Sequence, residues 1–385
     1  MEPISGLNFL ELLNMVKRIH LIAFLILMVF SSCEQAGENP FWDNGEESFE
    51  VVEIFDEGRF PNVVVALDGT VIATWGNKKY EVRRSEDGGK TWEQKITVAD
   101  PGFQGGGVIV DENKGDILAF VEEGHPISPL TMYRSSDNGK SWKAEDIVIH
   151  PDENGNIPSM HMNERGITLQ HGPHKGRLIR PTRSYTGGND RSFWPEHYTN
   201  AIYSDDGGKS WHTSAPFPAL GTGEATLEEL SDGSIYYNSR RHLSTDGLDP
   251  RKRHIAWSYD GGETWEDLSV SEELPDGDQN RDYGLMGGLV RLPVKGQDIL
   301  LFSNIESQEG RTHGTVWASF DGGKTWPAKK LVEKGSFAYS SMVAGREGTP
   351  SEGKIYLLYE SGEGAKIAIF NLAWVTGGRD WKEYM

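Results

Sequence analysis

The stretch that decides the fold is Ser85-Glu86-Asp87-Gly88-Gly89-Lys90-Thr91-Trp92, which has the pattern Ser-x-Asp-x-Gly-x-Thr/Ser-Trp. We interpret this octapeptide as a tight hairpin turn. The Asp87 side chain can accept hydrogen bonds from the amides of its own turn, and Gly89 can adopt a positive φ. The final Trp92 buries a large aromatic surface, which we expect to hold the turn against the sheet to which it belongs.

The octapeptide, an Asp box, occurs five times. The further copies are 135–142, 204–211, 258–265 and 319–326. Their first serines lie 50, 69, 54 and 61 residues apart, a period that suits one four-stranded blade of a β-propeller per copy. Turn chemistry already accounts for the five aspartates, and each box offers too few acidic oxygens for a calcium ion. We therefore predict structural aspartates and no metal site.

A second repeat runs in phase with the boxes: an apolar strand, a turn that contains glycine, and another strand. Its turns centre on Gly69, Gly115, Gly176, Gly233, Gly296 and Gly353. Six such hairpins against five boxes predict an all-β fold, a six-bladed β-propeller over residues 50–385. We expect an N-terminal strand near Glu50 to Phe55 to join the last blade, and no long helix.

The first 33 residues have the features of a targeting segment. Lys17 and Arg18 precede an apolar run from Leu21 to Phe30, which is shorter than the roughly 20 residues that a membrane-spanning helix needs. Small residues then precede Cys33, the only cysteine, as in a bacterial lipobox. We predict a lipoprotein signal peptide over 1–33, lipidation at Cys33 and a flexible tether over 34–49. A plain secretory signal is the alternative.

The chain is strongly acidic, with a formal net charge of −20 at pH 7. This charge argues against nucleic acid as a binding partner and against adhesion to anionic membranes. We therefore expect contact with a membrane only through the N-terminal lipid, on the outer membrane or cell surface of a Gram-negative bacterium or facing its periplasm. We also expect a monomer. A small anionic substrate is still compatible with the charge, provided that arginines cluster locally.

Blade geometry separates the residues by rim. The turns between strands one and two and between strands three and four share a rim, which carries the boxes and the glycine hairpins. The opposite rim holds residues that precede a first or third strand or follow a second strand. These are Arg59, Glu122, Glu123, His125, Arg183, Glu224, Arg240, Arg311, Tyr339 and Glu360. Arginines, carboxylates and a tyrosine at one axial mouth predict a site for an anionic ligand.

These residues resemble the sialidase (exo-α-neuraminidase) superfamily, across essentially all of residues 50–385. Gly58-Arg59-Phe60-Pro61 is similar to the family's Arg-Ile-Pro motif, and the segment 221–240 is similar to the stretch with the catalytic glutamate and the second arginine. Residues 301–311 resemble the stretch with the third arginine. Residues 338–341 and 357–360 resemble those with the nucleophilic tyrosine and a glutamate that steadies the first arginine.

The resemblance implies a role for each residue. Arg59, Arg240 and Arg311 would grip the carboxylate of a sialic acid or a related acidic sugar, with Glu360 bracing Arg59. Tyr339 would be the nucleophile and Glu224 its base, because a neutral phenol approaches the negatively charged anomeric centre without the repulsion that a carboxylate nucleophile would meet. The implied activity is that of a retaining exo-α-sialidase without a cofactor, acting on sialylated or other acidic glycans.

One departure from the family concerns the general acid. The family places an aspartate in the loop after the second strand of the first blade, but here that loop is Gly76-Asn77-Lys78-Lys79-Tyr80. Glu122, Glu123 and Glu81 are the candidates to replace it. Alternatively the acid is absent, and the two lysines bind a further anionic group.

Two other functions stay open at this level. One is a non-catalytic propeller that binds acidic glycans with the arginine grip alone. The other is a polysaccharide lyase in which Tyr339 or a histidine removes a proton next to a uronate.

Overall fold

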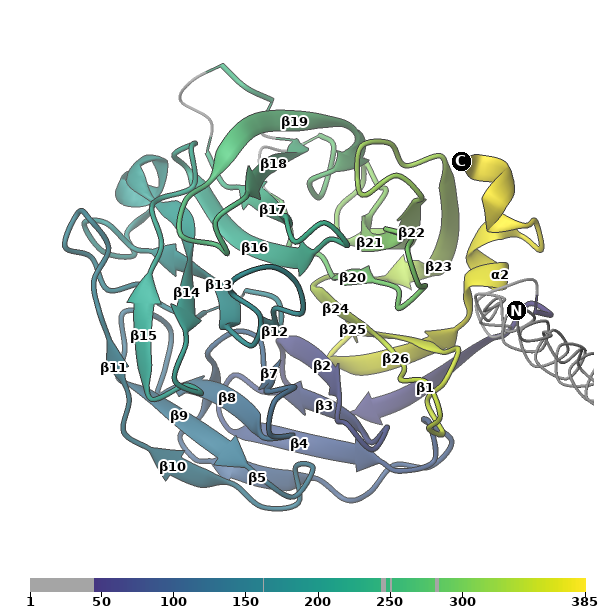
Figure 1. Ribbon diagram of the computed structural model, residues 1–385, viewed down its shortest axis with the longest axis horizontal. Coiled ribbons are helices and arrows are strands. Elements are labelled where there is room, and N and C mark those ends of the chain that lie inside the picture. Colours follow the sequence, from purple (N-terminus) through teal and green to yellow (C-terminus); the bar gives the residue numbers. More distant parts are fainter. Residues whose placement is uncertain (1–44, 162, 244–246, 250, 281–283) are drawn as a thin grey trace, which may run out of the picture. The chain divides into compact units, whose positions relative to one another are not determined.

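The computed structural model describes residues 45–161, 163–243, 247–249, 251–280 and 284–385, and in this part of the chain six β-sheets form a ring (Figure 1). The predicted signal peptide, Cys33 and most of the tether lie outside it. Blade one is β2 (Pro61–Val65), β3 (Val71–Trp75), β4 (Tyr80–Ser85) and β5 (Ile96–Ala99). Blade two is β6 (Phe103–Gln104), β7 (Ile109–Val110), β8 (Ile117–Glu122), β9 (Leu130–Ser135) and β10 (Lys143–Glu145).

The next three blades follow in chain order. Blade three is β11 (Val148–Ile149), β12 (Ile167–Thr168), β13 (Leu178–Ser184), β14 (Tyr198–Ser204) and β15 (Ser210–Thr213). Blade four is β16 (Thr222–Glu229), β17 (Ile235–Arg241), β18 (Lys252–Ser258) and β19 (Glu266–Pro275). Blade five is β20 (Leu289–Arg291), β21 (Leu300–Ile305), β22 (Thr312–Ser319) and β23 (Ala328–Ser336). The predicted six-bladed propeller is confirmed.

The last blade closes the ring in the way the sequence predicted. It contains β24 (Ser340–Ala344), β25 (Ile355–Ser361) and β26 (Gly364–Phe370), and its outer strand is the N-terminal β1 (Phe49–Phe55). β1 pairs antiparallel with β26 over its whole length, with one irregularity between Glu53 and Phe55. Ser48, at the end of the predicted tether, already donates its amide to Asn371. The last predicted tether residue, Phe49, is thus already part of β1.

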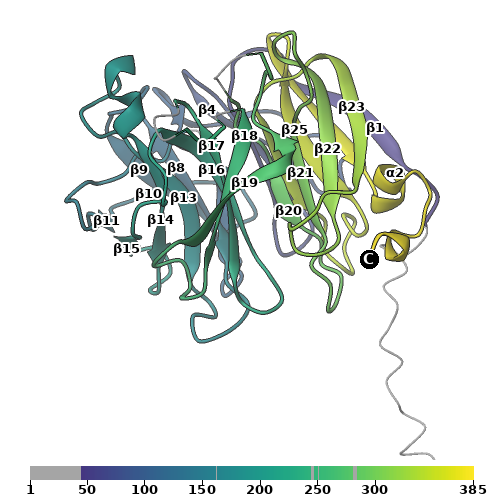
Figure 2. The same cartoon turned by 90° about the horizontal axis from the view of Figure 1, so that it is seen from above.

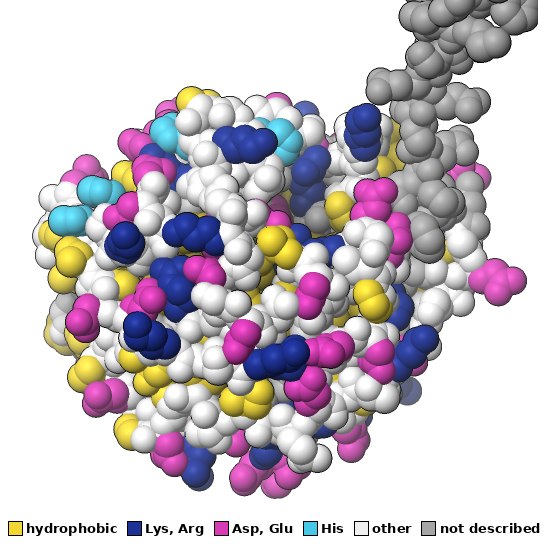
Figure 3. Space-filling view, turned by 60° about the horizontal axis from the view of Figure 1, so that its bottom comes forward, with side chains coloured by type: hydrophobic (Ala, Val, Ile, Leu, Met, Phe, Trp, Pro, Cys, Tyr) yellow, Lys and Arg dark blue, Asp and Glu magenta, His cyan; other side chains and the backbone are white. Residues whose placement is uncertain are grey.

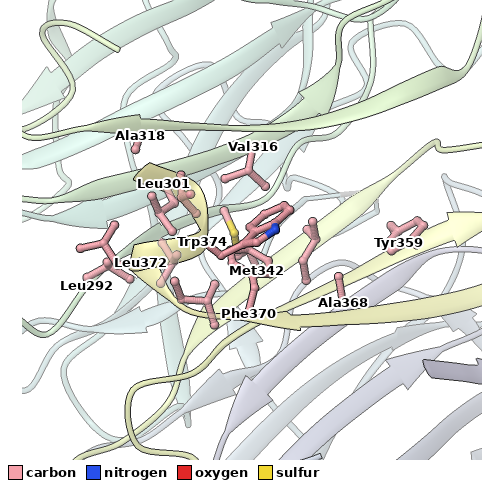
Figure 4. Close-up of a cluster of buried hydrophobic side chains, with 14 of the residues drawn as sticks. Leu292, Leu301, Val316, Ala318, Met342, Tyr359, Ala368, Phe370, Leu372 and Trp374 are labelled. Carbon is pink, nitrogen blue, oxygen red and sulfur yellow. The ribbon is translucent and has the colours of Figure 1, made fainter. Parts of the chain in front are cut away.

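Helices are short and few in the described residues, as expected. They are η1 (Arg191–Glu196), α2 (Leu372–Thr376) and η2 (Trp381–Tyr384). None of the described helices is long and apolar enough to cross a membrane. α2 lies beside β22 and β23 at the C-terminal end (Figure 2). Its Trp374 packs into an apolar cluster with Leu301, Val316 and Phe370 (Figure 4), which anchors this end of the chain to the fifth and sixth blades.

Each Asp box forms the predicted turn. In the first copy Ser85 Oγ donates to Asp87 Oδ1 at 2.8 Å, and Asp87 accepts the amide and the hydroxyl of Thr91 at 2.9 and 2.6 Å. Gly89 has φ 95°. Asn138 of the second box donates to Asp68 in the hairpin of blade one at 2.6 Å. The structural role of the aspartates and the shared rim of boxes and hairpins are therefore confirmed.

Box tryptophans pack on their own sheets, as predicted: Trp265 lies 4.4 Å from Tyr237 of blade four, and Trp326 lies 6.2 Å from Phe302 of blade five. The structure adds contacts to the preceding blade, because Trp211 of blade three lies edge-on to Phe120 of blade two at 5.3 Å. Trp326 of blade five contacts Tyr236 of blade four at 6.5 Å. The reason is geometric, because adjacent blades of a propeller pack face to face and the outermost strands turn their large side chains into the gap between them. These tryptophans therefore join neighbouring blades.

Replacing Asp87 with alanine should lower the free energy of unfolding by about 0.5–2 kcal/mol at neutral pH, as for a side chain that caps backbone amides. Hydrogen bonds from Thr91 hold the pKa of Asp87 at about 2, below its ordinary value, so the carboxylate stabilises the fold above pH 4. The deficit of the variant should shrink as the pH falls from about 4 toward 2. Denaturant unfolding at several pH values measures this difference in the free energy of unfolding. The exposed Asp146→Ala is the control. A deficit that does not change with pH would contradict the assignment.

Candidate active site

Arg59 is fixed at the mouth by the chain on both sides of it. Gly58 has φ 102°, and a Cβ there would lie 2.7 Å from the indole nitrogen of Trp75, so only glycine fits. Phe60 has φ 77°, an unfavourable conformation for a large side chain. Its amide donates to Glu360 Oε1 at 3.1 Å, which holds this turn. Strain retained next to an arginine is typical of a functional site.

The Arg59 guanidinium and the Glu360 carboxylate form a two-pronged pair. Nε and Nη2 donate to the two carboxylate oxygens, both at 3.1 Å. Glu360 lies in β25 and is buried, whereas the Arg59 side chain is 41% exposed. Burial lowers the pKa of Arg59, but the charge and the hydrogen bonds of Glu360 outweigh it, so the net pKa is raised. Arg59 is therefore both charged and rigidly aimed, with an exposed side for a ligand.

Glu224 and Arg240 come from adjacent strands of blade four. The register of β16 against β17 shifts between Thr222 and Ala225, so Glu224 sits in a bulge, a device that redirects a side chain. Arg240 is fully buried, and its Nη1 donates to Glu224 Oε2. The pair places a carboxylate and a guanidinium side by side below the mouth.

Tyr339 stands at the centre of this group. It directly precedes β24 and is 5% exposed. Its hydroxyl donates to Glu224 Oε1 at 3.4 Å and accepts from Arg240 Nη1 at 3.3 Å. The guanidinium carbons of Arg59 and Arg311 lie 5.3 and 4.9 Å from its ring centre. Three arginines from three blades and one carboxylate thus surround a single phenol.

Arg311 differs from the other two arginines. It directly precedes β22 and is half-buried. Arg59 and Arg240 each pair with a carboxylate, but Arg311 forms no ion pair within the described residues. Its cationic head is therefore available to an anion. On the face shown in Figure 3, basic side chains are interspersed with acidic ones.

The candidate general acids lie in different surroundings. Glu122 is the last residue of β8 and only 2% exposed; its Oε1 accepts from Ser159 Oγ at 2.7 Å and from the Met160 amide at 3.2 Å. Burial raises the pKa of Glu122 to about 7. Glu123 is exposed. Glu122 is therefore a carboxyl group whose protonation is changed by the fold.

Glu81 lies in β4, beside the turn that follows β3. β3 ends at Trp75 and β4 begins at Tyr80, so the loop that carries the acid in the family is a four-residue turn here. A cavity of about 420 Å³ opens beside this turn, lined by Arg59, Lys78, Lys79, Glu81 and Glu360 among others. Glu81 pairs with Lys95 at 3.5 Å, and Lys79 pairs with Asp100 at 2.8 Å.

The structure adds residues near Tyr339 for which no role was predicted. An aromatic series leads away from Tyr339: Phe60 lies 6.0 Å from its ring, His161 lies 5.4 Å from Phe60, and His125 lies 4.7 Å from His161. Arg183 is buried beside this series, and its Nη2 contacts His197 Nδ1 at 2.7 Å. His125 and Arg183 were placed on the correct rim from the sequence. His161 lies in an irregular segment that carries no sequence signal.

Among the residues that the structure describes, no three His, Cys, Asp or Glu side chains are placed to hold a metal ion together. Around Tyr339 the described side chains offer guanidinium groups, a phenol and the Glu224 carboxylate.

Comparison with known proteins shows the family to which the chain belongs. The family model of the BNR repeat-like domain matches residues 69–356. A sialidase of Micromonospora viridifaciens is 32% identical over 381 residues, covering 89% of this chain and 55% of that protein. A sialidase of Bacteroides fragilis (strain YCH46) is 27% identical over 355 residues, covering 79% of this chain and 60% of that protein. The chain thus spans a little over half the length of these relatives.

Solved structures show the same fold. The Hadza microbial sialidase Hz136 superimposes with a TM-score of 0.66 at 25% identity, over 83% of this chain and 66% of that one. A leech intramolecular trans-sialidase superimposes with a TM-score of 0.66 at 16% identity, over 89% of this chain and 70% of that one.

Proposed function

Because the chain belongs to the sialidase and BNR-repeat family, we propose that it is an exo-acting glycoside hydrolase that removes a terminal sialic acid, or a related acidic sugar, from glycans. The observation that carries this proposal is the contact of Arg59, Arg240 and Arg311 with the ring or hydroxyl of Tyr339. A sugar with a carboxylate on its anomeric carbon, held by these arginines, would have its reactive centre next to the phenol.

The arginines would bind the substrate carboxylate. Guanidinium groups donate two parallel hydrogen bonds in a fixed plane, so they orient a carboxylate as well as attract it. Glu360 keeps Arg59 in place, while Arg311 has no ion pair in the described residues and would gain one from the substrate. An anion therefore completes the charge balance of this cluster.

Tyr339 would attack the anomeric carbon, with Glu224 taking the phenol proton. The carboxylate is within 3.4 Å of the hydroxyl, and adjacent guanidinium groups stabilise the developing phenolate charge. A covalent glycosyl–tyrosine would then be released by water. Two displacements at one carbon give retention of configuration.

The test is the hydrolysis of an aryl α-sialoside by the full-length protein, followed by proton NMR. We expect turnover, and we expect the α-anomer of the free sugar to appear before it mutarotates. Binding without turnover would instead support the glycan-binding alternative. An unsaturated product that absorbs in the near ultraviolet from a uronate polysaccharide would support the lyase. The surface location and lipid anchor remain predictions from the sequence.

A further inference from the structure

The proposed reaction needs a group that protonates the leaving oxygen, and the short turn after β3 supplies no carboxylate. The pKa of Glu122, about 7, suits a general acid. However, Glu122 is only 2% exposed, and one of its carboxylate oxygens accepts hydrogen bonds from Ser159 and Met160, so a substrate has little access to it. A general acid must come within hydrogen-bond distance of the atom it protonates. Access therefore distinguishes the candidates better than acidity does.

His125 has the access that Glu122 lacks. It follows β8 on the mouth rim and is exposed. Its ring lies 5.7 Å from Phe103 and 4.7 Å from His161, the aromatic series that begins at Tyr339. The imidazole thus stands at the outer end of a wall that leads to the phenol, where the leaving group of an exo-acting enzyme would project.

The orientation of the ring is set through one nitrogen. Nδ1 of His125 lies 3.3 Å from the Pro126 carbonyl oxygen and 2.7 Å from the side-chain nitrogen of Asn189. The tautomer relevant to catalysis is the one in which Nδ1–H donates a hydrogen bond to the Pro126 carbonyl oxygen and the Asn189 amide is turned so that its oxygen, rather than its nitrogen, faces Nδ1. In that tautomer Nε2 is the atom that can gain and lose a proton. No partner of Nε2 is found within the described residues.

We propose that His125 is the general acid and base of the reaction, an inference that rests on the proposed function. In the first step the Nε2 proton passes to the glycosidic oxygen as its bond to the anomeric carbon breaks. The Tyr339 oxygen bonds to that carbon, and the phenol proton passes to Glu224. In the second step neutral Nε2 takes a proton from water, the water oxygen bonds to the anomeric carbon, and Glu224 returns its proton to the departing phenolate.

Charges around His125 predict the pH dependence. Partial burial and the positive charge of Arg183 lower the pKa of His125 below its ordinary value near 6.5, against the raising effects of the Pro126 carbonyl and of the Glu224 charge. His161 adds no charge at neutral pH, because burial holds its pKa well below 6.5. The acid form of His125 is therefore lost as the pH rises through a value below 6.5. With Glu122 as the acid, the same loss would occur at about pH 7.

The test compares kcat/KM for an aryl α-sialoside and for a sugar-linked α-sialoside, because the first leaving group needs little protonation. His125→Gln should lower kcat/KM for the sugar-linked substrate by about 10²- to 10⁴-fold and spare the aryl one. His150→Gln, a histidine stacked on His212 at 4.8 Å, is the matched control and should change neither. Asn189→Asp should raise the pH at which sugar-linked turnover is lost by about 1 unit or more, since it places a carboxylate against Nδ1.

Four results would overturn the inference. The first is an equal loss for both substrates in His125→Gln, which would indicate a structural role. The second is leaving-group dependence in Glu122→Gln instead, with a pH limit near 7. The third is wild-type turnover with an unaffected His125→Gln, which would remove only the assignment of the histidine. The fourth is a wild-type protein that cleaves neither substrate, which would overturn the proposed function as well.

Discussion

Replacing Tyr339 with phenylalanine should lower kcat for an aryl α-sialoside by about 10³-fold or more, because removal of a nucleophile eliminates the covalent route. The substitution deletes one oxygen and keeps the ring that Arg59 and Arg311 contact. Binding of free sialic acid should therefore survive. Mass spectrometry after incubation with a fluorinated sialoside should show a covalent adduct on the wild type and none on the variant.

Tyr359→Phe is the matched control for this experiment. Tyr359 is buried in β25, one residue before Glu360, and its hydroxyl has no hydrogen-bond partner in the described residues. The control therefore removes the same atom from a neighbouring tyrosine with little cost in stability. Undiminished hydrolysis by Tyr339→Phe would exclude the phenol as nucleophile, whereas equal losses in both variants would indicate a general effect on folding.

The propeller could be predicted because its signals are local. In an Asp box the serine, the aspartate and the glycine bond one another within four residues, as Ser85, Asp87 and Gly89 do. Strand order then follows from counting hairpins, and the rim of a residue follows from whether its strand runs toward or away from the mouth. That rule predicts that Arg59, Glu224 and Tyr339 lie at the same rim.

What the sequence did not predict depends on contacts between distant segments. Trp211 packs on Phe120 of the preceding blade, 91 positions earlier in the chain. No local sequence pattern encodes which residues of the neighbouring blade this side chain contacts. The burial of Glu122 is created by Ser159, and the orientation of His125 by Asn189, each from another blade. Acidity and access are properties of such environments, so a list of rim residues could not rank the candidate acids.

Replacing Arg311 with alanine should lower kcat/KM for sialosides by roughly 30- to 4,000-fold, the equivalent of about 2–5 kcal/mol for truncating one partner of a buried charge pair. The free energy of unfolding should change less than the free energy that corresponds to the loss of kcat/KM. The reason is that Arg311 has no ion pair within the described residues, so its removal leaves no protein carboxylate unpaired. Steady-state kinetics and calorimetric binding of free sialic acid measure the two effects.

A second substitution distinguishes attraction of the carboxylate by charge alone from a clamp, in which the planar guanidinium binds the carboxylate through hydrogen bonds of fixed geometry. Arg311→Lys keeps the charge but replaces a planar fork with a single point donor, so a clamp predicts a loss between those of wild type and Arg311→Ala. Arg379→Ala, an exposed arginine near the C-terminus, changes the net charge equally and should leave kcat/KM unchanged. If Arg311→Lys matched wild type, attraction by charge alone would explain binding. If Arg311→Ala did so, the carboxylate would be bound elsewhere, and the proposed orientation of the sugar over Tyr339 would be wrong.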